Sequence, residues 1–377
     1  MMGTPTLEAE EDIVVVGINH RLNVYGFLYL GDFDEKYRDS GIAGMLDVIM
    51  ALEWVRDNVA AFGGDPGNVT IMGESGGGSK CSMLMAMPAA RGLFHKAIVE
   101  SGSFPLGIRT PAEAAEKARA YLDRLGIGTD ELDKLLEVPP EVLSDTAWEM
   151  GYEPEIAGDD RWLAYNPRQE YPVYPGSEHI PTIIGMSAEE FGLFNIEEIK
   201  DITWETLPDW VARLRAGGLG GGGMECPPER IPALIEAVKT QAGAPITPQQ
   251  AYLRIQSLCT FGCNVFEQTL TRARDARAPV WSYLVTYAGP WPRNHPTAWH
   301  TQDLALQFRV VLDPESEPLS RTLGHAWAAF CRTGSPSTEE LLWPPYTPEG
   351  RLTMLFDQPC RLESDPLALP RKVLMDR

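Results

Sequence analysis

One pentapeptide limits the possible folds of this chain more than any other feature. Gly73-Glu74-Ser75-Gly76-Gly77 matches the pattern G-x-S-x-G and stands between a short β-branched run and a segment of small and apolar residues. In this position the pattern predicts a sharp turn from strand to helix, because small neighbours let the backbone bend and lift the serine hydroxyl above a sheet. The helix that follows would point its N–H groups and its dipole at developing negative charge. The sequence therefore predicts a nucleophilic serine on an α/β scaffold.

Signals for strands and helices alternate along the chain. Apolar stripes at helical spacing predict helices over residues 45–62 and 319–332. Short apolar runs predict buried strands at 12–19, 68–73, 96–100, 182–185, 280–285 and 352–356. This alternation predicts the α/β fold class, with a mostly parallel central sheet and flanking helices. We expect one domain over residues 1–377, with a variable, largely helical region at 104–268 inserted in it.

The charge balance and the hydropathy pattern limit the partners. The chain of 377 residues has 32 Lys and Arg against 53 Asp and Glu, a formal net charge of −21. Nucleic acid is not an expected partner, because the positive surplus that neutralises phosphates is missing. No apolar run reaches the roughly 18 residues that span a bilayer. Residues 1–12 lack the apolar core of a secretory signal. The sequence leaves the cellular location, cytoplasmic or secreted, and the oligomeric state open.

Three blocks of sequence resemble one family of enzymes. Residues 19–28 resemble the N-Y-R-L-G-x-x-G-F-L segment of the type-B carboxylesterase, cholinesterase and lipase family. The run F-G-G-D-P at 62–66, followed by G-E-S at 73–75, is similar to the nucleophile block of that family, and residues 327–346 resemble its C-terminal block. The resemblance covers nearly the whole chain. It implies an α/β-hydrolase fold and a carboxylic ester hydrolase.

The resemblance also implies a Ser–Glu–His triad, in the chain order expected for that fold. The nucleophile is Ser75. The acid falls in a segment similar to the G-x-x-x-D-E-G pattern of the family, where counting from the glycine selects Glu190 and leaves Glu189 as an alternative. The base falls in a segment similar to H-x-x-(D/E)-(I/L), which favours His300 over the nearby His295.

These residue types predict acyl-enzyme chemistry on a small-molecule ester. A serine hydroxyl is a weak nucleophile near neutral pH, so His300 would remove its proton. Glu190 would hold the imidazole in the correct tautomer and stabilise the imidazolium. The backbone N–H of Gly76 would donate to the oxyanion. This chemistry requires no metal and no organic cofactor.

Three further residues match positions that have supporting roles in the family. Arg21 and Asp47 match a pair that forms a buried salt bridge, in which loss of one partner would leave a stranded charge. Ser101 matches a serine near the triad that is thought to assist it. A simple hydrogen bond at the end of a strand would explain Ser101 equally well.

One part of the family pattern is missing from the sequence. Family members carry an H-G-G-G-like loop upstream of the segment that residues 19–28 match, and its N–H groups supply further oxyanion donors. Residues 1–11 contain nothing similar. We therefore expect an N-terminally truncated chain, in which Met1 or Met2 is not the natural start. Because loss of one oxyanion donor costs about 10²–10³ in kcat, the alternative function is that of a non-catalytic or impaired family member used for binding.

Overall fold

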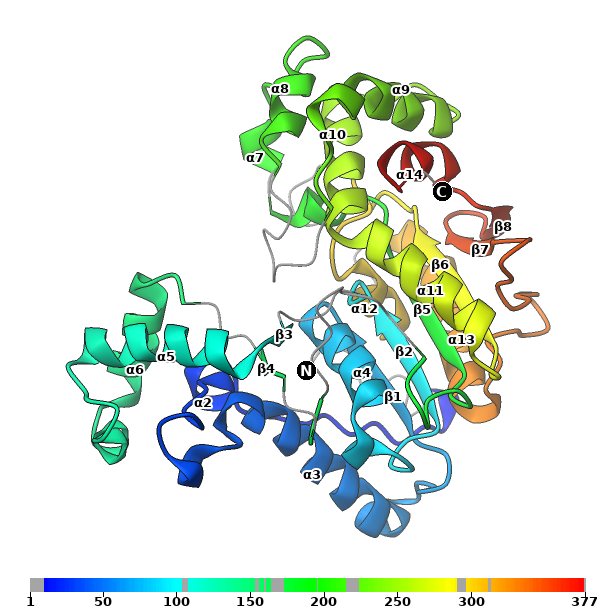
Figure 1. Cartoon of the computed structure of the whole chain (residues 1–377). Coiled ribbons are helices and arrows are strands. Elements are labelled where there is room, and N and C mark those ends of the chain that lie inside the picture. Colours follow the sequence, from blue (N-terminus) through cyan, green and yellow to red (C-terminus); the bar gives the residue numbers. More distant parts are fainter. Residues whose placement is uncertain are drawn as a thin grey trace.

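A six-stranded, mostly parallel sheet forms the centre of the computed structural model (Figure 1). The structure describes residues 10–103, 108–152, 156–158, 161–163, 173–194, 196–214, 224–289, 296–310 and 313–375. The strand order is β1-β2-β5-β6-β7-β8, with β8 alone antiparallel to its neighbour. These strands are β1 (Thr70–Glu74), β2 (Lys96–Glu100), β5 (Thr182–Ser187), β6 (Val280–Val285), β7 (Leu352–Phe356) and β8 (Arg361–Ser364). The short strands β3 (Ile108–Arg109) and β4 (Ile156–Ala157) pair in a separate small sheet.

Helices surround the central sheet. Their bounds are α2 (Asn23–Phe27), α3 (Ala43–Asn58), α4 (Gly76–Ala86), α5 (Pro111–Leu125), α6 (Pro140–Glu149), α7 (Ile196–Ile199), α8 (Leu207–Ala212), α9 (Ile231–Gln241), α10 (Pro248–Ser257), α11 (Cys263–Asp275), α12 (Gln302–Gln307), α13 (Glu317–Thr333) and α14 (Ala368–Met375). The helices predicted over 45–62 and 319–332 are confirmed as α3, extended by a 3₁₀ turn, and α13.

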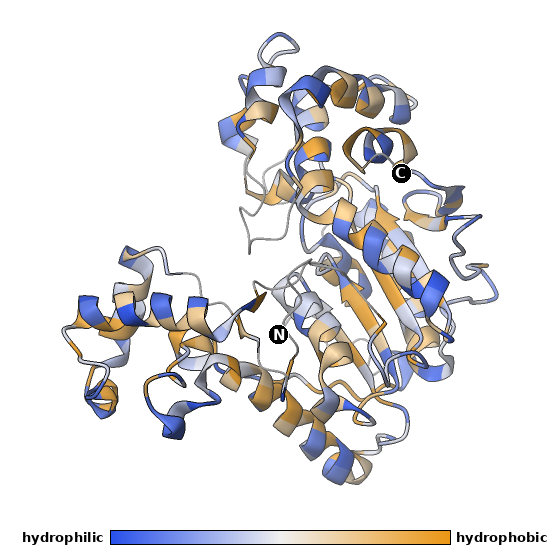
Figure 2. Ribbon diagram, in the orientation of Figure 1, coloured by the Kyte–Doolittle hydropathy of each residue, from blue (hydrophilic) through white to orange (hydrophobic). Residues whose placement is uncertain are grey.

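Neighbouring residues of each central strand point into different cores, because side chains alternate across a sheet. In β5, Ile183 packs in the core that includes α13, while Ile184 packs in the core shared with α4 and α11. In β6, Tyr283 packs in the core that includes α13, and Leu284 packs in the core shared with α4 and α11. The strands are accordingly apolar along their length in Figure 2, as expected for a parallel sheet covered on both faces. The predicted α/β class is confirmed.

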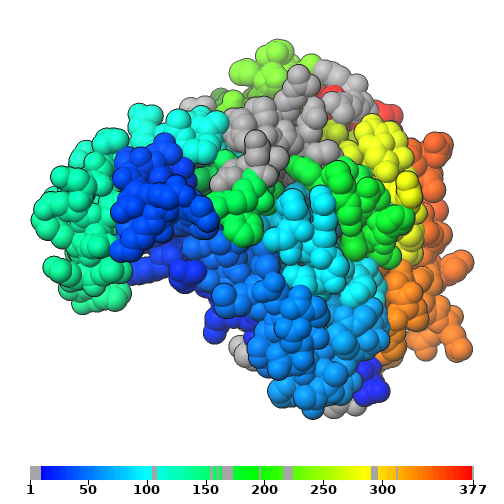
Figure 3. Space-filling view, turned by 60° about the horizontal axis from the view of Figure 1, so that its bottom comes forward, coloured from blue at the N-terminus to red at the C-terminus, as the bar shows by residue number. Residues whose placement is uncertain are grey.

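Two groups of helices extend beyond the sheet. Helices α5 and α6 share a small core with the segment that holds α2, in which Val24 and Leu28 pack with Tyr121 and Leu122. This group forms one end of the molecule in Figure 3, where its teal atoms lie beside the dark blue atoms of the α2 segment. Helices α8, α10 and α14 contact α9 in the second group. The 104–268 region is thus largely helical where it is described, although it also contributes the central strand β5. That the whole chain is one domain stays a prediction.

The predicted strand at 12–19 is wrong. These residues have no regular secondary structure, and Val14, Val16 and Ile18 are about two-fifths exposed. A β-branched run forms a strand only where a neighbouring strand supplies ladder hydrogen bonds, and no strand among the described residues pairs with it. The segment is held at its start, where the Glu11 carboxylate meets the guanidinium of Arg309.

The sequence patterns did not anticipate β8 and α14. Strand β8 is a half-exposed edge strand with charged residues, and α14 contributes only a few buried side chains. No helix in the described ranges combines the length and the apolar character that crossing a membrane requires.

Candidate active site

The chain turns sharply at Ser75, between β1 and α4. Ser75 has φ 55° and ψ −122°, a conformation that is costly for a residue with a side chain. Gly73 allows the turn, because a Cβ at this position would lie 2.3 Å from the carbonyl carbon of Gly77. The Ser75 N–H donates to the carbonyl of Glu100 over 2.8 Å, which ties the turn to the end of β2. The predicted strand-to-helix turn is confirmed.

A close contact between backbones sets the spacing of α4 and the end of β2. A Cβ at Gly102 would lie 2.4 Å from the Cα of Gly78. The Ser79 hydroxyl, one residue further along α4, donates to the carbonyl of Gly102 over 3.2 Å. Glycine at both contact positions lets the two backbones touch without an intervening side chain.

Glu190, His300 and Ser101 meet where β2 and β5 end. His300 Nδ1 lies 2.5 Å from Glu190 Oε2. The other oxygen, Oε1, accepts from the Ser101 hydroxyl over 2.7 Å and from the Ser187 N–H over 2.8 Å. The imidazole also stacks on the ring of Phe261, with centroids 5.5 Å apart. Both oxygens of one buried carboxylate are therefore occupied, and that carboxylate and an aromatic ring orient the histidine.

The alternatives at these positions lie elsewhere. The Glu189 carboxylate forms an ion pair with Arg254 over 2.9 Å instead of approaching His300. His295 falls outside the described residues. Thr301, the residue after His300, has φ 71° and ψ 5°. This left-handed conformation is one that glycine adopts more readily than threonine.

A second carboxylate contacts the other nitrogen of His300. Glu74 Oε1 lies 3.2 Å from His300 Nε2, and both side chains are buried. Burial opposes the charged imidazolium, but Glu190, Glu74 and Asp303 outweigh it and raise the pKa of His300 to about 9. Burial also raises the pKa of Glu74 to about 8, against the opposing effect of His300. The Ser75 hydroxyl makes no hydrogen bond to His300 within the described residues, so Nε2 faces Glu74 in this structure.

Two more acids lie buried behind the histidine. Burial raises the pKa of Asp303 to about 6, although the hydroxyl of Tyr283 donates to Asp303 Oδ2 over 2.6 Å. Burial, together with the charge of Asp303, holds the pKa of Glu100 well above its usual range. The indole Nε1–H of Trp327 donates to Glu100 Oε1 over 2.7 Å. The site therefore contains more carboxyl groups than a triad uses, and donors from the core hold them.

Gly76 and the Arg21–Asp47 pair complete the predicted set. Gly76 is the first residue of α4, where backbone N–H groups have no acceptor within the helix. Arg21 forms the expected salt bridge with Asp47, through two contacts of 2.6 and 2.8 Å. The prediction that this pair is buried is wrong, because the Arg21 side chain is 56% exposed and that of Asp47 is 21% exposed. No described strand pairs with the segment that precedes Arg21.

The sequence patterns did not identify Glu74 and Asp303 as parts of the site. Each lies inside a motif already singled out, Glu74 as the variable position of G-x-S-x-G and Asp303 as the acid three residues after His300. The available signal was a carboxylate directly before Ser75 and another three residues after His300. No group of three or more His, Cys, Asp or Glu in the described part of the chain is arranged to hold a metal ion.

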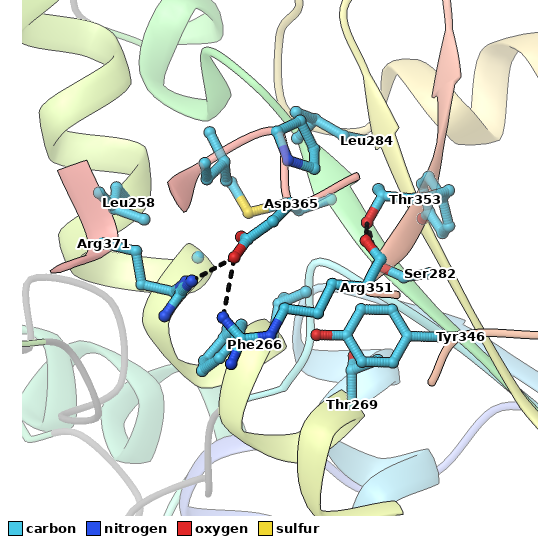
Figure 4. Close-up of a pocket in the computed structure, with 16 residues that line it drawn as sticks. Leu258, Phe266, Thr269, Ser282, Leu284, Tyr346, Arg351, Thr353, Asp365 and Arg371 are labelled. Carbon is cyan, nitrogen blue, oxygen red and sulfur yellow. Dashed lines mark hydrogen bonds and ion pairs between the residues drawn. The ribbon is translucent and has the colours of Figure 1, made fainter. Parts of the chain in front are cut away.

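Two neighbouring cavities lie away from Ser75, and neither Ser75 nor His300 lines them. The smaller has a volume of about 50 Å³ and contains Arg351 and Arg371, which both point toward Asp365 (Figure 4). The larger has a volume of about 230 Å³. They share five lining residues, which are Met186, Leu258, Leu284, Pro366 and Leu367.

Comparison with known proteins gives consistent matches along the whole chain. A family model described as "Carboxylesterase family" matches residues 1–368. The para-nitrobenzyl esterase of Bacillus subtilis (strain 168) is 33% identical over 389 residues, which cover 98% of this chain and 74% of that protein. The cocaine esterase of Homo sapiens is 31% identical over 399 residues, covering 97% of this chain and 68% of that protein.

Solved structures give the same result. A carboxylesterase from Geobacillus stearothermophilus superposes with a TM-score of 0.79 at 31% identity, covering 99% of this chain and 78% of that one. An esterase from Clostridium hathewayi, whose description says that it can hydrolyse aliphatic aromatic polyesters, superposes with a TM-score of 0.78 at 29% identity. That match covers 98% of this chain and 74% of the other. The central sheet and its flanking helices therefore have the α/β-hydrolase fold.

Proposed function

The chain belongs to the carboxylesterase family and is a carboxylic ester hydrolase, and from this premise we propose that Ser75, Glu190 and His300 form its catalytic triad. One observation carries the proposal. The 2.5 Å contact between Glu190 and His300 lies next to the strained turn that presents Ser75. A carboxylate on Nδ1 directs the opposite nitrogen of the ring toward a substrate, as a general base requires.

The proposed reaction has two steps. The Ser75 hydroxyl attacks the ester carbonyl while His300 Nε2 takes its proton, and the alcohol leaves with that proton. Water then attacks the acyl-enzyme and gives a proton to the same nitrogen, which passes it to the Ser75 oxygen as the carboxylic acid leaves. The Gly76 N–H at the start of α4 donates to the oxyanion in both steps. For the first step, Nε2 has to turn from Glu74, 3.2 Å away, toward the serine hydroxyl.

Two features of the site support Ser101 as a positioning residue. Its hydroxyl donates to Glu190 Oε1 over 2.7 Å, which fixes the carboxylate for its contact with His300. Its own backbone has φ 46° and its N–H donates to the carbonyl of Gly185, so the hydroxyl is held from two strands. We expect Arg21 and Asp47 to act only on stability, because they lie outside this network.

The test combines hydrolysis of a short-chain p-nitrophenyl ester with labelling of the nucleophile. Ser75→Ala should reduce turnover by about 10³-fold or more. Ser364→Ala, at an exposed position of β8, should leave turnover unchanged. A fluorophosphonate probe should add its mass to the peptide that contains Ser75 and to no other peptide. If the unmodified chain neither hydrolyses the ester nor takes the probe, the proposal fails and the alternative, a family member used for binding, is favoured.

A further inference from the structure

A lysine lies one turn into the helix that follows the proposed nucleophile. Helical side chains lean toward the N-terminal end of their helix, and Lys80 of α4 reaches back in this way. Its Nζ donates to the carbonyl of Gly76 over 3.2 Å. A Cβ added at Gly76 would lie 3.7 Å from the same nitrogen. The ammonium is therefore held beside the residue whose N–H donates to the oxyanion in the proposed reaction.

The surroundings of this ammonium do not favour its positive charge. A helix N-terminus carries a partial positive charge, which repels a cation near it. The Lys80 side chain is partly buried, and burial lowers the pKa of its ammonium. No carboxylate within the described ranges pairs with it, and its side chain hydrogen-bonds there only to a backbone carbonyl. Stability of the fold therefore does not account for a cation at this position.

No side chain separates this ammonium from the turn at the start of α4. Ser75 is followed by three glycines at 76–78, and a Cβ added at Gly77 would meet no atom within 4 Å. The Lys80 side chain is itself neither fully buried nor fully exposed. Because lysine has a flexible four-carbon stem, an ester that reaches the serine hydroxyl is also within reach of the ammonium.

The proposed reaction creates negative charge at this end of α4. The carbonyl oxygen of the ester becomes an oxyanion when the serine attacks. Glu74, Glu190 and Asp303 all act electrostatically on His300, and the same charges oppose an anion that forms close by. The N–H of Gly76 has to stabilise the oxyanion against these charges. A cation beside Gly76 offsets their effect.

We propose that Lys80 is a further catalytic residue, whose ammonium donates a hydrogen bond to the oxyanion beside the N–H of Gly76. This role rests on the proposed function, in which Ser75 forms the acyl-enzyme. An ammonium has three N–H donors, so it can keep its bond to the Gly76 carbonyl while it contacts the oxyanion. The ester oxygen is uncharged in the ground state and gains its charge only as the serine adds. An interaction that strengthens only in the transition state raises kcat and leaves KM nearly unchanged.

Steady-state hydrolysis of a p-nitrophenyl ester tests the role of the charge. Lys80→Met removes the ammonium and keeps most of the length of the side chain. It should lower kcat by about tenfold or more and change KM by less than about twofold. Lys80→Arg keeps the charge and should retain at least about a third of kcat. Lys372→Met, at an exposed position of α14, should behave as the unmodified chain. Full activity in Lys80→Met, or equal losses in Lys80→Met and Lys80→Arg, overturns the proposal.

A pair of inhibitors separates loss of the charge from a general disturbance of the site. A trifluoromethyl ketone forms an anionic tetrahedral adduct with a reactive serine and so resembles the transition state, whereas the corresponding secondary alcohol cannot be attacked. Lys80→Met should weaken inhibition by the ketone by about tenfold or more and leave inhibition by the alcohol unchanged. Unchanged inhibition by the ketone, or an equal loss for both inhibitors, overturns the role of Lys80.

The fluorophosphonate probe distinguishes failure of this role from failure of the proposed function. The unmodified chain and Lys80→Met should both reach complete labelling of the peptide that contains Ser75. If the unmodified chain takes no label, the nucleophile and the role of Lys80 fail together. If both are labelled and Lys80→Met keeps its kcat and its inhibition by the ketone, only the role of Lys80 fails. Lys80→Gln replaces Lys80→Met in each assay if the latter shows no cooperative thermal transition.

Discussion

Replacing Glu74 by glutamine should shift the pH dependence of ester hydrolysis toward acid. His300 lies between two carboxylates, with Nδ1 2.5 Å from Glu190 and Nε2 3.2 Å from Glu74, and its pKa is raised to about 9. A histidine acts as a general base only in its neutral form. A raised pKa keeps it protonated up to higher pH, so activity should appear only at higher pH. Glu74→Gln keeps the size of the side chain and removes one of the two charges that favour the imidazolium.

The structure sets the magnitude of this shift. Two unit charges 3.2 Å apart attract each other by about 5 kcal/mol at an effective dielectric constant of about 20. The pKa of Glu74 is itself raised to about 8, so this carboxyl is charged only in part of the relevant range. The two groups titrate together, and only part of the attraction appears as a shift in the activity of the enzyme. We expect the rising, acidic limb of the pH profile of kcat/KM to move to lower pH by about one to two units, which corresponds to about 1.4–2.7 kcal/mol.

The assay is kcat/KM for a p-nitrophenyl ester from about pH 5 to about pH 10, since that ratio reports the ionisation of the free enzyme. The Glu53→Gln variant, at an exposed position of α3, controls for the loss of a distant charge and should keep the original profile. If the acidic limb of the profile stays in place in Glu74→Gln, or moves toward alkaline pH, Glu74 does not raise the pKa of His300.

Three further substitutions test the packing around the site by chemical denaturation. Gly185→Ala places a Cβ 2.2 Å from the ring of Tyr283, and this overpacking should lower the free energy of unfolding by about 1–3 kcal/mol or more. Trp327→Phe removes the donor 2.7 Å from the buried Glu100 carboxyl and should lower it by about 1–3 kcal/mol. Asp47→Ala should change it by less than about 1 kcal/mol, because the Arg21 side chain of that ion pair is 56% exposed to solvent. A loss for Asp47→Ala larger than that for Trp327→Phe would contradict this ranking of buried over exposed contacts.

The parts of the fold that depend on local pattern were predictable. The predicted strands at 96–100 and 280–285 coincide with β2 and β6, because both are buried on two faces and bounded by polar or small residues. Helix α13 ends at Thr333, one residue after the predicted end, where Gly334 with φ 80° terminates it. A strand whose formation depends on a neighbour was not predictable in this way. Residues 12–19 have the composition of a strand, but no described strand lies beside them to pair with.

The contacts within the candidate site could be predicted only in part. The resemblance to the family's acid segment favoured Glu190 over Glu189, and Glu190 contacts His300, while the catalytic role of both stays a prediction. The contact between Glu74 and His300 joins residues more than two hundred positions apart. It depends on how the end of β1 packs against the loop before α12, and no local pattern records that packing. The exposure of Arg21 could not be read from its motif for the same reason.

The contact between Gly78 and Gly102 determines where the surroundings of Ser75 can change by mutation. Any side chain at either position would force α4 away from β2 and would displace Ser75 relative to Ser101, so a library randomised at both codons should return active clones that encode only glycine there. The opposite holds at Gly77, where an added Cβ would meet no atom within 4 Å. Substitutions should therefore be tolerated on the open side of α4, where Gly77 lies, and not on the side of α4 that faces the sheet. A search for new substrate ranges next to the serine should begin at that open side.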